Sequence, residues 1–533
     1  MKKHNLFKVI VLTFLAIVVL TWIIPAGGYG TGEYVSNGRI PLGLFDLVRT
    51  PLIAFANLMQ YAYVLLVIGG LYGVLSKTGA YAPLVEKWAN KIKGKKFLVV
   101  MIAIIAILES VTGATFAIFL IIPFLASLVL KKGYGKLTAM ASTIGALLLG
   151  DMAATYNYNI LGYMSEYLGV SLTTNLIPSC ILLVLSIIIY SVIVVKTAKV
   201  QMIEIEEEIE VEEKVPVKKS TRSSKTASET KTSKSKTAAE TKSSKTKTVK
   251  TTKAKKEEQE FKIEKKIIKK IRKEVAPVEI PFIDESVSKK GTLALTIFMI
   301  IVFVFTVVAM FNWSSVFGID FFNNLYTKIT SIEIAKYPLF KNILGTFSPM
   351  GTWSNYDLVI FVVLVTFVIG FIYNVKLDDM LDGYAKGARR MAKPAFYVVL
   401  ATIIYASMFS TSTGDNIYYT LIHKLLGSKE KVNLLASGVL SGFGSLLYSD
   451  FQSLIGTIAA PYALVFTKFM NVAAFILQSI YGLVSFVSPA GIVTVLGLSY
   501  FDVSYKEWFK YIWKFLVGVV IITGIIVAVL VFA

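Results

Sequence analysis

Cysteine and histidine are nearly missing from this chain of 533 residues, which has one cysteine, Cys180, and two histidines, His4 and His423. One chain with this inventory cannot build a disulfide framework, a Cys/His zinc site or a c-type haem attachment. The sequence also lacks a G-x-x-x-x-G-K-[ST] loop, a glycine-rich dinucleotide turn and an H-E-x-x-H motif. We therefore expect no enzyme, no ATP-driven machinery and no organic cofactor.

Charge is scarce outside one segment, although the formal net charge is +21 and 55% of the residues are hydrophobic. Residues 201–290 hold 24 of the 55 Lys and Arg and 17 of the 34 Asp and Glu. Elsewhere, apolar runs of about 20 residues recur, and each could cross a hydrocarbon core of roughly 30 Å. The sequence predicts an all-α, polytopic membrane protein with about 10–11 transmembrane segments.

The first candidate span follows Lys2, Lys3 and Lys8. Because more spans come after it, we interpret it as an uncleaved first helix rather than a signal peptide. The further candidate spans are 52–78, 97–130, 136–162, 176–196, 292–312, 357–376, 394–412, 432–468, 470–500 and 511–532. Lysine-rich loops at 87–96 and 131–136 lie on the side of the N-terminus, which predicts a multi-pass protein of the cell membrane with a cytoplasmic N-terminus.

Residues 201–290 form the most unusual segment. Their first part is acidic, the middle part is a Lys/Ser/Thr repeat, and 257–275 resembles an amphipathic helix. The middle part has too few large apolar residues to offset the entropy of ordering it, so we expect disorder there. This predicts a first membrane repeat at 1–200, a charged, largely disordered cytoplasmic linker at 201–290, and a connecting helix with a second repeat at 291–533. Membrane lipid is an expected partner, and nucleic acid is not.

Two long apolar segments are predicted to be hairpins. Segment 97–130 begins and ends at lysine clusters, so both of its ends face one side of the membrane. The same count puts both ends of 432–468 on the opposite side. Oppositely directed hairpins are typical of an inverted repeat, which places the substrate between the halves near the middle of the membrane.

An internal alignment favours this repeat. Residues 63–96 lie over 397–430 at a spacing of about 335, which pairs Thr78-Gly79 with Thr413-Gly414. Farther along, 109–130 lies over 445–466 with a small slip, and Pro123 then meets Pro461.

Four carboxylates, Glu109, Asp151, Asp415 and Asp450, stand within apolar segments. Burial of a charge in a span costs at least about 2.5 kcal/mol, so such residues are functional by default. Glu109 and Asp450 belong to the predicted hairpin tips, where hydroxyls and freed carbonyls could bind a hard cation. Asp415 lies near a predicted outer interface and is a weaker candidate. The structural alternative is that the small polar residues of the tips simply allow close helix packing.

Two stretches, 150–159 and 482–491, are predicted to be unwound at corresponding places in the two halves. Helix N-termini there would attract a substrate carboxylate. The candidate substrate- or cation-binding residues are Glu109, Ser110, Thr112, Gly113, Thr115, Asp151, Asn157, Asn159, Ser449, Asp450, Gln452, Ser453, Ser485 and Ser488. Among them, Thr112, Thr115, Asp450 and Ser453 form a possible Na⁺ site.

A family resemblance rests on the order of several short motifs. They are Trp22-Ile23-Ile24-Pro25-Ala26-Gly27, Thr78-Gly79-Ala80, the Gly/Thr-containing first hairpin, Gln452, Ser488-Pro489-Ala490-Gly491 and Tyr505-Lys506-Glu507-Trp508. Together they resemble the C4-dicarboxylate anaerobic carrier-like (YfcC/DcuC type) transporter family of the ion transporter superfamily, over most of the chain except 197–290.

The resemblance implies a secondary active carrier for a small carboxylate-bearing metabolite, driven by Na⁺, H⁺ or exchange. Related carriers are often dimers, so a homodimer is the expected assembly. The chain departs from the family pattern at Tyr448-Ser449-Asp450-Phe451-Gln452, at Ser488-Pro489-Ala490-Gly491 and at Asn157-Tyr158-Asn159. The extra acids favour a basic amino acid, as in an arginine/ornithine antiporter, as an alternative substrate. A passive channel and a membrane-anchored binding protein are the alternative classes.

Overall fold

The computed structural model describes residues 5–29, 33–216, 261–275, 279–283, 291–334, 337–345, 347–409, 415–426 and 433–532. The chain divides into two compact units, Met202–Ala276 and the remainder. The expected disorder of the Lys/Ser/Thr stretch, the end of the span 394–412 and the Thr413-Gly414 match fall outside the described residues.

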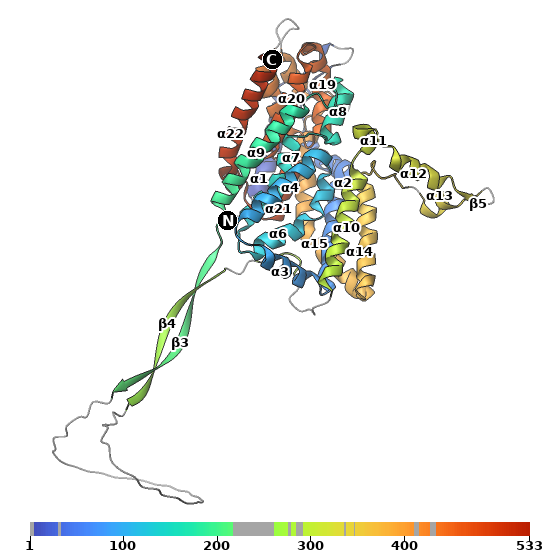
Figure 1. The fold of residues 1–533 in the computed structure, drawn as a ribbon. Coiled ribbons are helices and arrows are strands. Elements are labelled where there is room, and N and C mark those ends of the chain that lie inside the picture. The colour runs from blue at the N-terminus through green and yellow to red at the C-terminus, as the bar shows by residue number, and fades with distance from the viewer. Residues whose placement is uncertain are drawn as a thin grey trace, which may run out of the picture. The chain divides into compact units, whose positions relative to one another are not determined.

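Helices dominate the described chain (Figure 1). Those of the first half are α1 (Asn5–Ile23), α2 (Asp46–Lys77), α3 (Tyr81–Lys91), α4 (Lys96–Thr112), α5 (Thr115–Phe119), α6 (Ile122–Lys131), α7 (Lys136–Met152), α8 (Tyr158–Leu168) and α9 (Leu176–Thr197). Those of the second half are α10 (Thr292–Met310), α11 (Trp313–Phe317), α12 (Phe321–Thr330), α13 (Leu339–Leu344), α14 (Asn355–Ile372), α15 (Leu377–Ala401), α16 (Ile403–Ala406), α17 (Ile417–Leu426), α18 (Leu434–Leu447), α19 (Phe451–Val465), α20 (Met470–Ser485), α21 (Ile492–Tyr500) and α22 (Tyr505–Phe532).

The described strands form three two-stranded antiparallel pairs. They are β1 (Gly27–Tyr29) with β2 (Tyr34–Ser36), β3 (Met202–Pro216) with β4 (Phe261–Val275), and β5 (Glu333–Ile334) with β6 (Tyr337–Pro338).

Six described helices are long and apolar enough to cross a membrane, namely α1, α2, α9, α10, α14 and α22. Leu12, Ile188, Ile300, Ile360 and Ile525 are exposed on five of them, as expected where a helix faces lipid. Shorter apolar helices of 10–17 residues, including α18, α19 and α20, are also present among the described residues. The expected all-α polytopic membrane architecture is confirmed.

Both predicted hairpins form. Phe97 at the start of α4 contacts Tyr134 after α6, with ring centroids 6.0 Å apart, so the chain returns to the end where it entered. In the second hairpin, the Ser437 hydroxyl of α18 lies 2.8 Å from the Tyr462 hydroxyl of α19. Each hairpin precedes an inner helix that breaks, α7–α8 or α20–α21, and a closing helix, α9 or α22.

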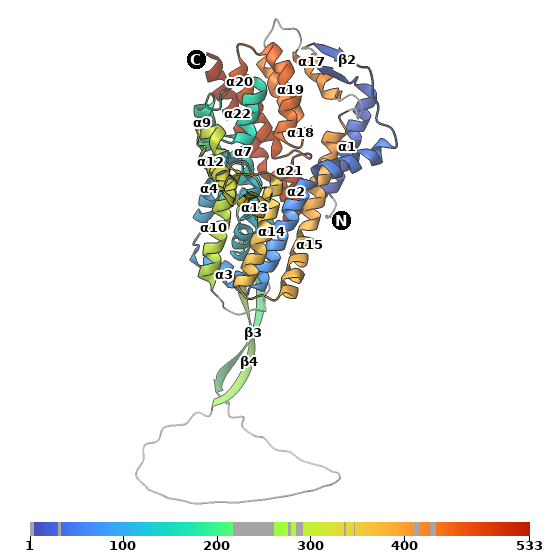
Figure 2. The same ribbon diagram turned by 90° about the vertical axis from the view of Figure 1, so that its right-hand side faces the viewer.

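Corresponding helices of the two halves run antiparallel, as an inverted repeat requires. Helices α9 and α22 meet where Tyr190 contacts Phe515 at 5.0 Å and where Thr197 donates to the Tyr511 hydroxyl at 2.8 Å. Helices α2 and α15 lie side by side (Figure 2).

Glycines allow the close approach of α2 and α15. A Cβ atom on Gly73 would lie 2.0 Å from the Gly383 carbonyl oxygen, and one on Gly387 would lie 2.0 Å from the Gly69 carbonyl oxygen. The spacings Gly69-x-x-x-Gly73 and Gly383-x-x-x-Gly387 are those with which membrane helices bring their backbones into contact.

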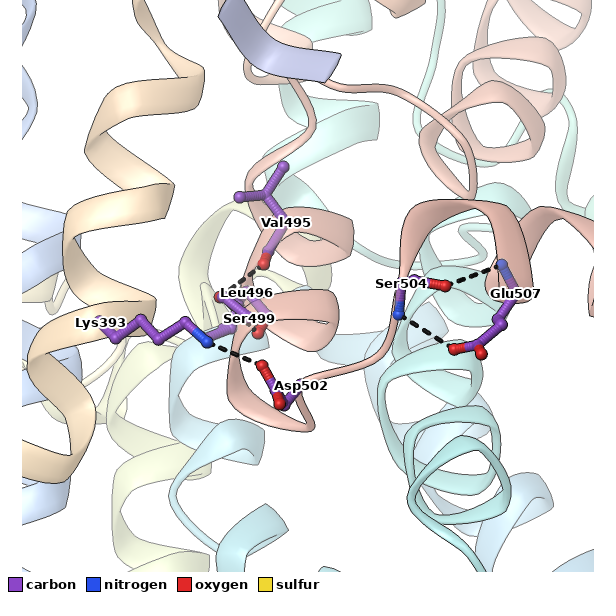
Figure 3. Close-up of polar contacts among 7 residues, drawn as sticks. All are labelled: Lys393, Val495, Leu496, Ser499, Asp502, Ser504 and Glu507. Atoms are coloured by element: carbon purple, nitrogen blue, oxygen red, sulfur yellow. Dashed lines mark hydrogen bonds and ion pairs between the residues drawn. The ribbon is translucent and has the colours of Figure 1, made fainter. Parts of the chain in front are cut away.

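The turn after α21 is tied to α15. Lys393 of α15 donates to the Asp502 carboxylate at 2.7 Å (Figure 3). Asp502 has φ of +53°, and the next N–H, that of Val503, reaches back to the Leu498 carbonyl at 3.0 Å, which closes α21. Ser504 and Glu507 then form reciprocal bonds at the start of α22, a capping box.

The prediction of a helix at 257–275 is wrong over residues 261–275. These residues form strand β4, which pairs with β3. The register sets Glu204 opposite Lys273, Glu208 opposite Lys269 and Glu212 opposite Lys265. The acidic partner strand is distant in sequence, so local amphipathicity could not indicate this pairing.

Candidate functional site

The tip of the first hairpin is a tight turn at Gly113. Gly113 has φ of +61°, and its N–H donates to the Glu109 carbonyl at 2.8 Å, which ends α4. A Cβ atom here would lie 1.9 Å from Asn157 Oδ1, so only glycine fits. Asn159 Nδ2 donates to the Gly113 carbonyl at 2.7 Å. The tip is therefore held against the start of α8.

Ser110 forms hydrogen bonds with the backbone at the break between α7 and α8. Its carbonyl accepts the N–H groups of Thr155, Tyr156 and Asn157 at 2.9, 3.2 and 3.2 Å. The Ser110 hydroxyl donates to the Ala153 carbonyl at 2.6 Å. Backbone groups freed by the break thus bond to the hairpin, which is how non-helical backbone is tolerated within a membrane.

The tip of the second hairpin is organised by Asp450, the N-cap of α19. Its carboxylate accepts the Ser453 N–H at 2.8 Å and the Ser453 hydroxyl at 3.1 Å. Next to it, Tyr163 of α8 donates to Gln452 Oε1 at 2.9 Å. A side chain of the first half therefore contacts the second tip.

The break between α20 and α21 is closed by Ser488 and Thr494. The Ser488 hydroxyl donates to the Leu446 carbonyl at 3.1 Å and accepts the Ala490 and Gly491 N–H groups. Thr494 donates to the Ser485 carbonyl. Both broken helices thus lie beside a hairpin tip.

The two hairpin tips and the two helix breaks border one cavity of about 360 Å³. Its polar wall includes the carboxylates Asp151 and Asp450. Within the part of the chain that the structure describes, none of the residues lining the cavity is Lys, Arg or His. The start of α21, at Gly491 and Ile492, also borders the cavity, and a helix N-terminus carries partial positive charge. The cavity thus joins an acidic wall to a helix N-terminus.

Eight of the candidate binding residues line this cavity, namely Gly113, Thr115, Asp151, Asn159, Ser449, Asp450, Gln452 and Ser485. The other six lie behind the wall and support it: Glu109, Ser110, Thr112, Asn157, Ser453 and Ser488. Their assignment to binding stays a prediction. Asp415 is not among the residues that line the cavity, and it lies near Gly28 of β1.

The possible Na⁺ site remains a prediction as well. Thr112 donates to the Leu108 carbonyl at 2.7 Å, and Thr115 donates to Glu109 Oε1 at 2.5 Å. Asp450 and Ser453 bond to each other in the other hairpin. The described residues contain no group of three or more His, Cys, Asp or Glu side chains that could hold a metal ion.

Sequence reasoning missed several lining residues, among them Gln60, Tyr61, Tyr163, Trp353, Asn355 and Tyr481. Gln60 could have been found from the sequence, because an amide within the apolar run of α2 is unusual. The aromatic residues carried none, because tyrosine and tryptophan are ordinary members of membrane helices.

Comparison with known proteins supplies one family match. Residues 4–252 match the family model described as DcuC: C4-dicarboxylate anaerobic carrier. No curated protein matches the chain significantly. Among solved structures, the YdaH transporter of Alcanivorax borkumensis aligns over 98% of each chain with 12% identity and a TM-score of 0.37. Agreement at that level does not establish a common fold.

The family match agrees with the resemblance seen in the motifs and points to a carrier rather than an enzyme. The chain is thus a multi-pass membrane protein whose residues 4–252 are similar to the C4-dicarboxylate anaerobic carrier family, DcuC.

Proposed function

We propose that this protein is a secondary active transporter that moves a small carboxylate-bearing metabolite across the cell membrane by alternating access. The substrate is a C4-dicarboxylate or an amino acid, and transport is coupled to Na⁺ or H⁺ or proceeds by exchange. One observation supports this proposal most strongly. Each half contributes one hairpin tip and one broken helix, and all four border a single cavity.

The charge of the cavity favours an amino acid over a dicarboxylate. A dianion would face Asp151 and Asp450 without a cationic side chain among the described lining residues. An ammonium or guanidinium group suits the two carboxylates, and a substrate carboxylate suits the N-terminus of α21. We therefore favour the exchange of basic amino acids, such as arginine and ornithine, as the transport reaction.

The hairpins are proposed to move as elevator-type elements that expose the cavity alternately to the two sides. A passive channel would need a continuous open path. The cavity is lined by hairpin tips and helix breaks of both halves, which supports a carrier. We propose that the N-terminus lies in the cytoplasm, on the basis of the lysine-rich loops, and that the carrier assembles as a homodimer.

An uptake screen in proteoliposomes tests this function. Labelled succinate, arginine, ornithine and alanine are compared with and without Na⁺ and pH gradients, and counterflow of each is measured. We expect saturable counterflow of at least one basic amino acid. Succinate uptake alone would contradict the charge argument, and non-saturating flux would favour a channel.

Matched variants connect any uptake to the cavity. Asp151→Asn should reduce uptake, whereas Asp379→Asn, which removes an exposed carboxylate at the start of α15, should not. Equal activity of the two variants would contradict binding at this cavity.

A further inference from the structure

Three short helices, α11, α12 and α13, connect α10 to α14 and extend away from the other helices (Figure 1). We call these three helices the arm. None of the residues of α11 or α12 is buried. Helices of this length are marginal in water and depend on burial of an apolar face for their stability. The arm therefore needs a surface that the described part of the chain does not supply.

The longest helix of the arm, α12, is amphipathic along its whole length. Its apolar face consists of Phe321, Phe322, Leu325, Tyr326 and Ile329. Its polar face consists of Asn323, Asn324, Thr327, Lys328 and Thr330. Phe321 is 61% exposed on the first face, and Asn324 and Thr327 are exposed on the second. Apolar and polar side chains of one helix are thus exposed on opposite sides.

Contacts within the connecting segment cover only part of the apolar face of α12. The Phe322 ring contacts Trp313 of α11, with centroids 6.0 Å apart. The Tyr326 ring contacts Phe347 at 4.9 Å. Leu325, one turn after Phe321, stays 40% exposed.

Helix α13 has the same character. Phe340 and Ile343 are exposed apolar side chains, and Ile343 is 67% exposed. Lys341 and Asn342 stand between them in the sequence and are also exposed. With 3.6 residues per turn, these two polar residues fall on the opposite side of the helix.

The helices that flank the arm fix its level relative to the membrane. At a rise of 1.5 Å per residue, the 19 residues of α10 and the 18 of α14 span about 28 and 27 Å. A hydrocarbon core is about 30 Å thick, so the ends of both helices lie near its surfaces. The arm starts where α10 ends and returns where α14 begins. Both ends of the arm therefore lie at the same membrane surface.

A tryptophan marks this level at each end of the connecting segment. Trp313 follows α10, and its Nε1 donates to the Val308 carbonyl at 2.8 Å. Trp353 precedes α14, and its Nε1 donates to the Ser348 carbonyl at 3.0 Å. Tryptophan is enriched at the boundary between membrane and water. An amphipathic helix at this level can place its apolar face among the acyl chains and its polar face in water.

We propose that α12 and α13 lie in the membrane–water interface and that their apolar faces bind the boundary between lipid headgroups and acyl chains. The arm is joined at both ends to helices whose exposed side chains, such as Ile300 and Ile360, face lipid, and this favours lipid over a second copy of the chain. Phe317 of α11 contacts Tyr156 at 5.2 Å, so the arm also links the membrane surface to the break between α7 and α8. This lipid contact goes beyond the transport function proposed above and does not depend on it.

Spin labelling of the full-length protein in phosphatidylcholine–phosphatidylglycerol liposomes tests the position of the arm. In the Cys180→Ser background, Leu325→Cys carries a label on the apolar face of α12 and Thr327→Cys carries one on the polar face. Collisions of each label with oxygen, which concentrates among acyl chains, and with a water-soluble nickel chelate are measured. We expect a clearly higher ratio of oxygen to nickel collisions at position 325 than at position 327.

Two results of this measurement would overturn the proposal. Equal access of the nickel chelate to both labels would place the arm in water. Spin–spin broadening at position 325 that disappears on dilution with unlabelled protein would assign the apolar face to a second copy of the chain.

Paired charge substitutions provide a second test with a matched control. Phe321→Glu with Ile343→Glu puts carboxylates on the apolar faces and should shift the label at position 325 toward water. Asn324→Glu with Asn342→Glu adds the same charges to the polar faces and should leave the label in lipid. All four residues are exposed, and size-exclusion profiles establish that the variants are folded. Equal shifts in the two pairs would contradict binding through the apolar faces.

Discussion

Asp450 has two separable roles at the residue scale. Its carboxylate caps α19 through Ser453, and it contributes negative charge to the cavity. Asparagine caps a helix about as well as aspartate, but it has no charge. Substitutions at this position can therefore distinguish the structural role from the electrostatic one.

We expect Asp450→Asn to unfold at nearly the wild-type temperature but to lose most uptake of a cationic substrate. Asp450→Ala should lose uptake and also about 1 kcal/mol of stability, because the cap is gone. Thermal unfolding in detergent and proteoliposome uptake check the two effects. Full uptake by Asp450→Asn would show that the charge is not used.

Gly113 is the second position where one residue decides the site. Gly113→Ala would place a methyl group 1.9 Å from Asn157 Oδ1, in addition to the cost of a positive φ. Gly169→Ala is the matched control, because Gly169 has φ of +67° and nothing within 4 Å of the added atom.

The control should cost about 1 kcal/mol, the ordinary penalty of the left-handed conformation. Gly113→Ala should cost clearly more in thermal unfolding, and Gly113→Ala with Asn157→Ala should recover part of the loss. Equal losses for Gly113→Ala and Gly169→Ala would mean that the hairpin tip relaxes freely.

At the scale of elements, the α2–α15 crossing depends on backbone contact between glycines. Gly73→Ala should destabilise the protein by about 1–3 kcal/mol, since the new methyl group overlaps the Gly383 carbonyl. Gly518→Ala in α22 meets nothing within 4 Å and should be neutral or stabilising by up to about 1 kcal/mol.

Thermal unfolding of both variants in the same detergent checks this difference. A Gly73→Ala variant as stable as Gly518→Ala would indicate that the two helices can separate. The Lys393–Asp502 pair is a weaker link between elements, because both side chains are about half exposed and such pairs contribute about 1 kcal/mol or less.

For the whole molecule, the lysine-rich loops predict which face is cytoplasmic. Because Cys180 is the single cysteine, Cys180→Ser gives a background for single-cysteine labelling. Glu86→Cys in α3 should react with a membrane-impermeant maleimide only after permeabilisation, and Asn324→Cys in α12 should react in intact cells. The reverse pattern would invert the proposed orientation.

The sequence by itself determined the membrane class, both hairpins and the positions of the two helix breaks. Apolar length decides whether a segment can enter the bilayer, and lysines at segment ends decide whether the chain returns, so both properties are local. The carboxylates were also evident from sequence, since a charge is conspicuous in an apolar run.

Tertiary structure alone decided which of those residues face a common cavity. Glu109 and Asp151 looked equivalent in sequence, yet only Asp151 lines the cavity, because Glu109 packs against α7 behind it. Tyr163 and Gln452 come together from opposite halves, and strand β4 depends on a partner segment distant in the chain. Such contacts depend on how elements pack across long sequence separations, which no local pattern of residues encodes.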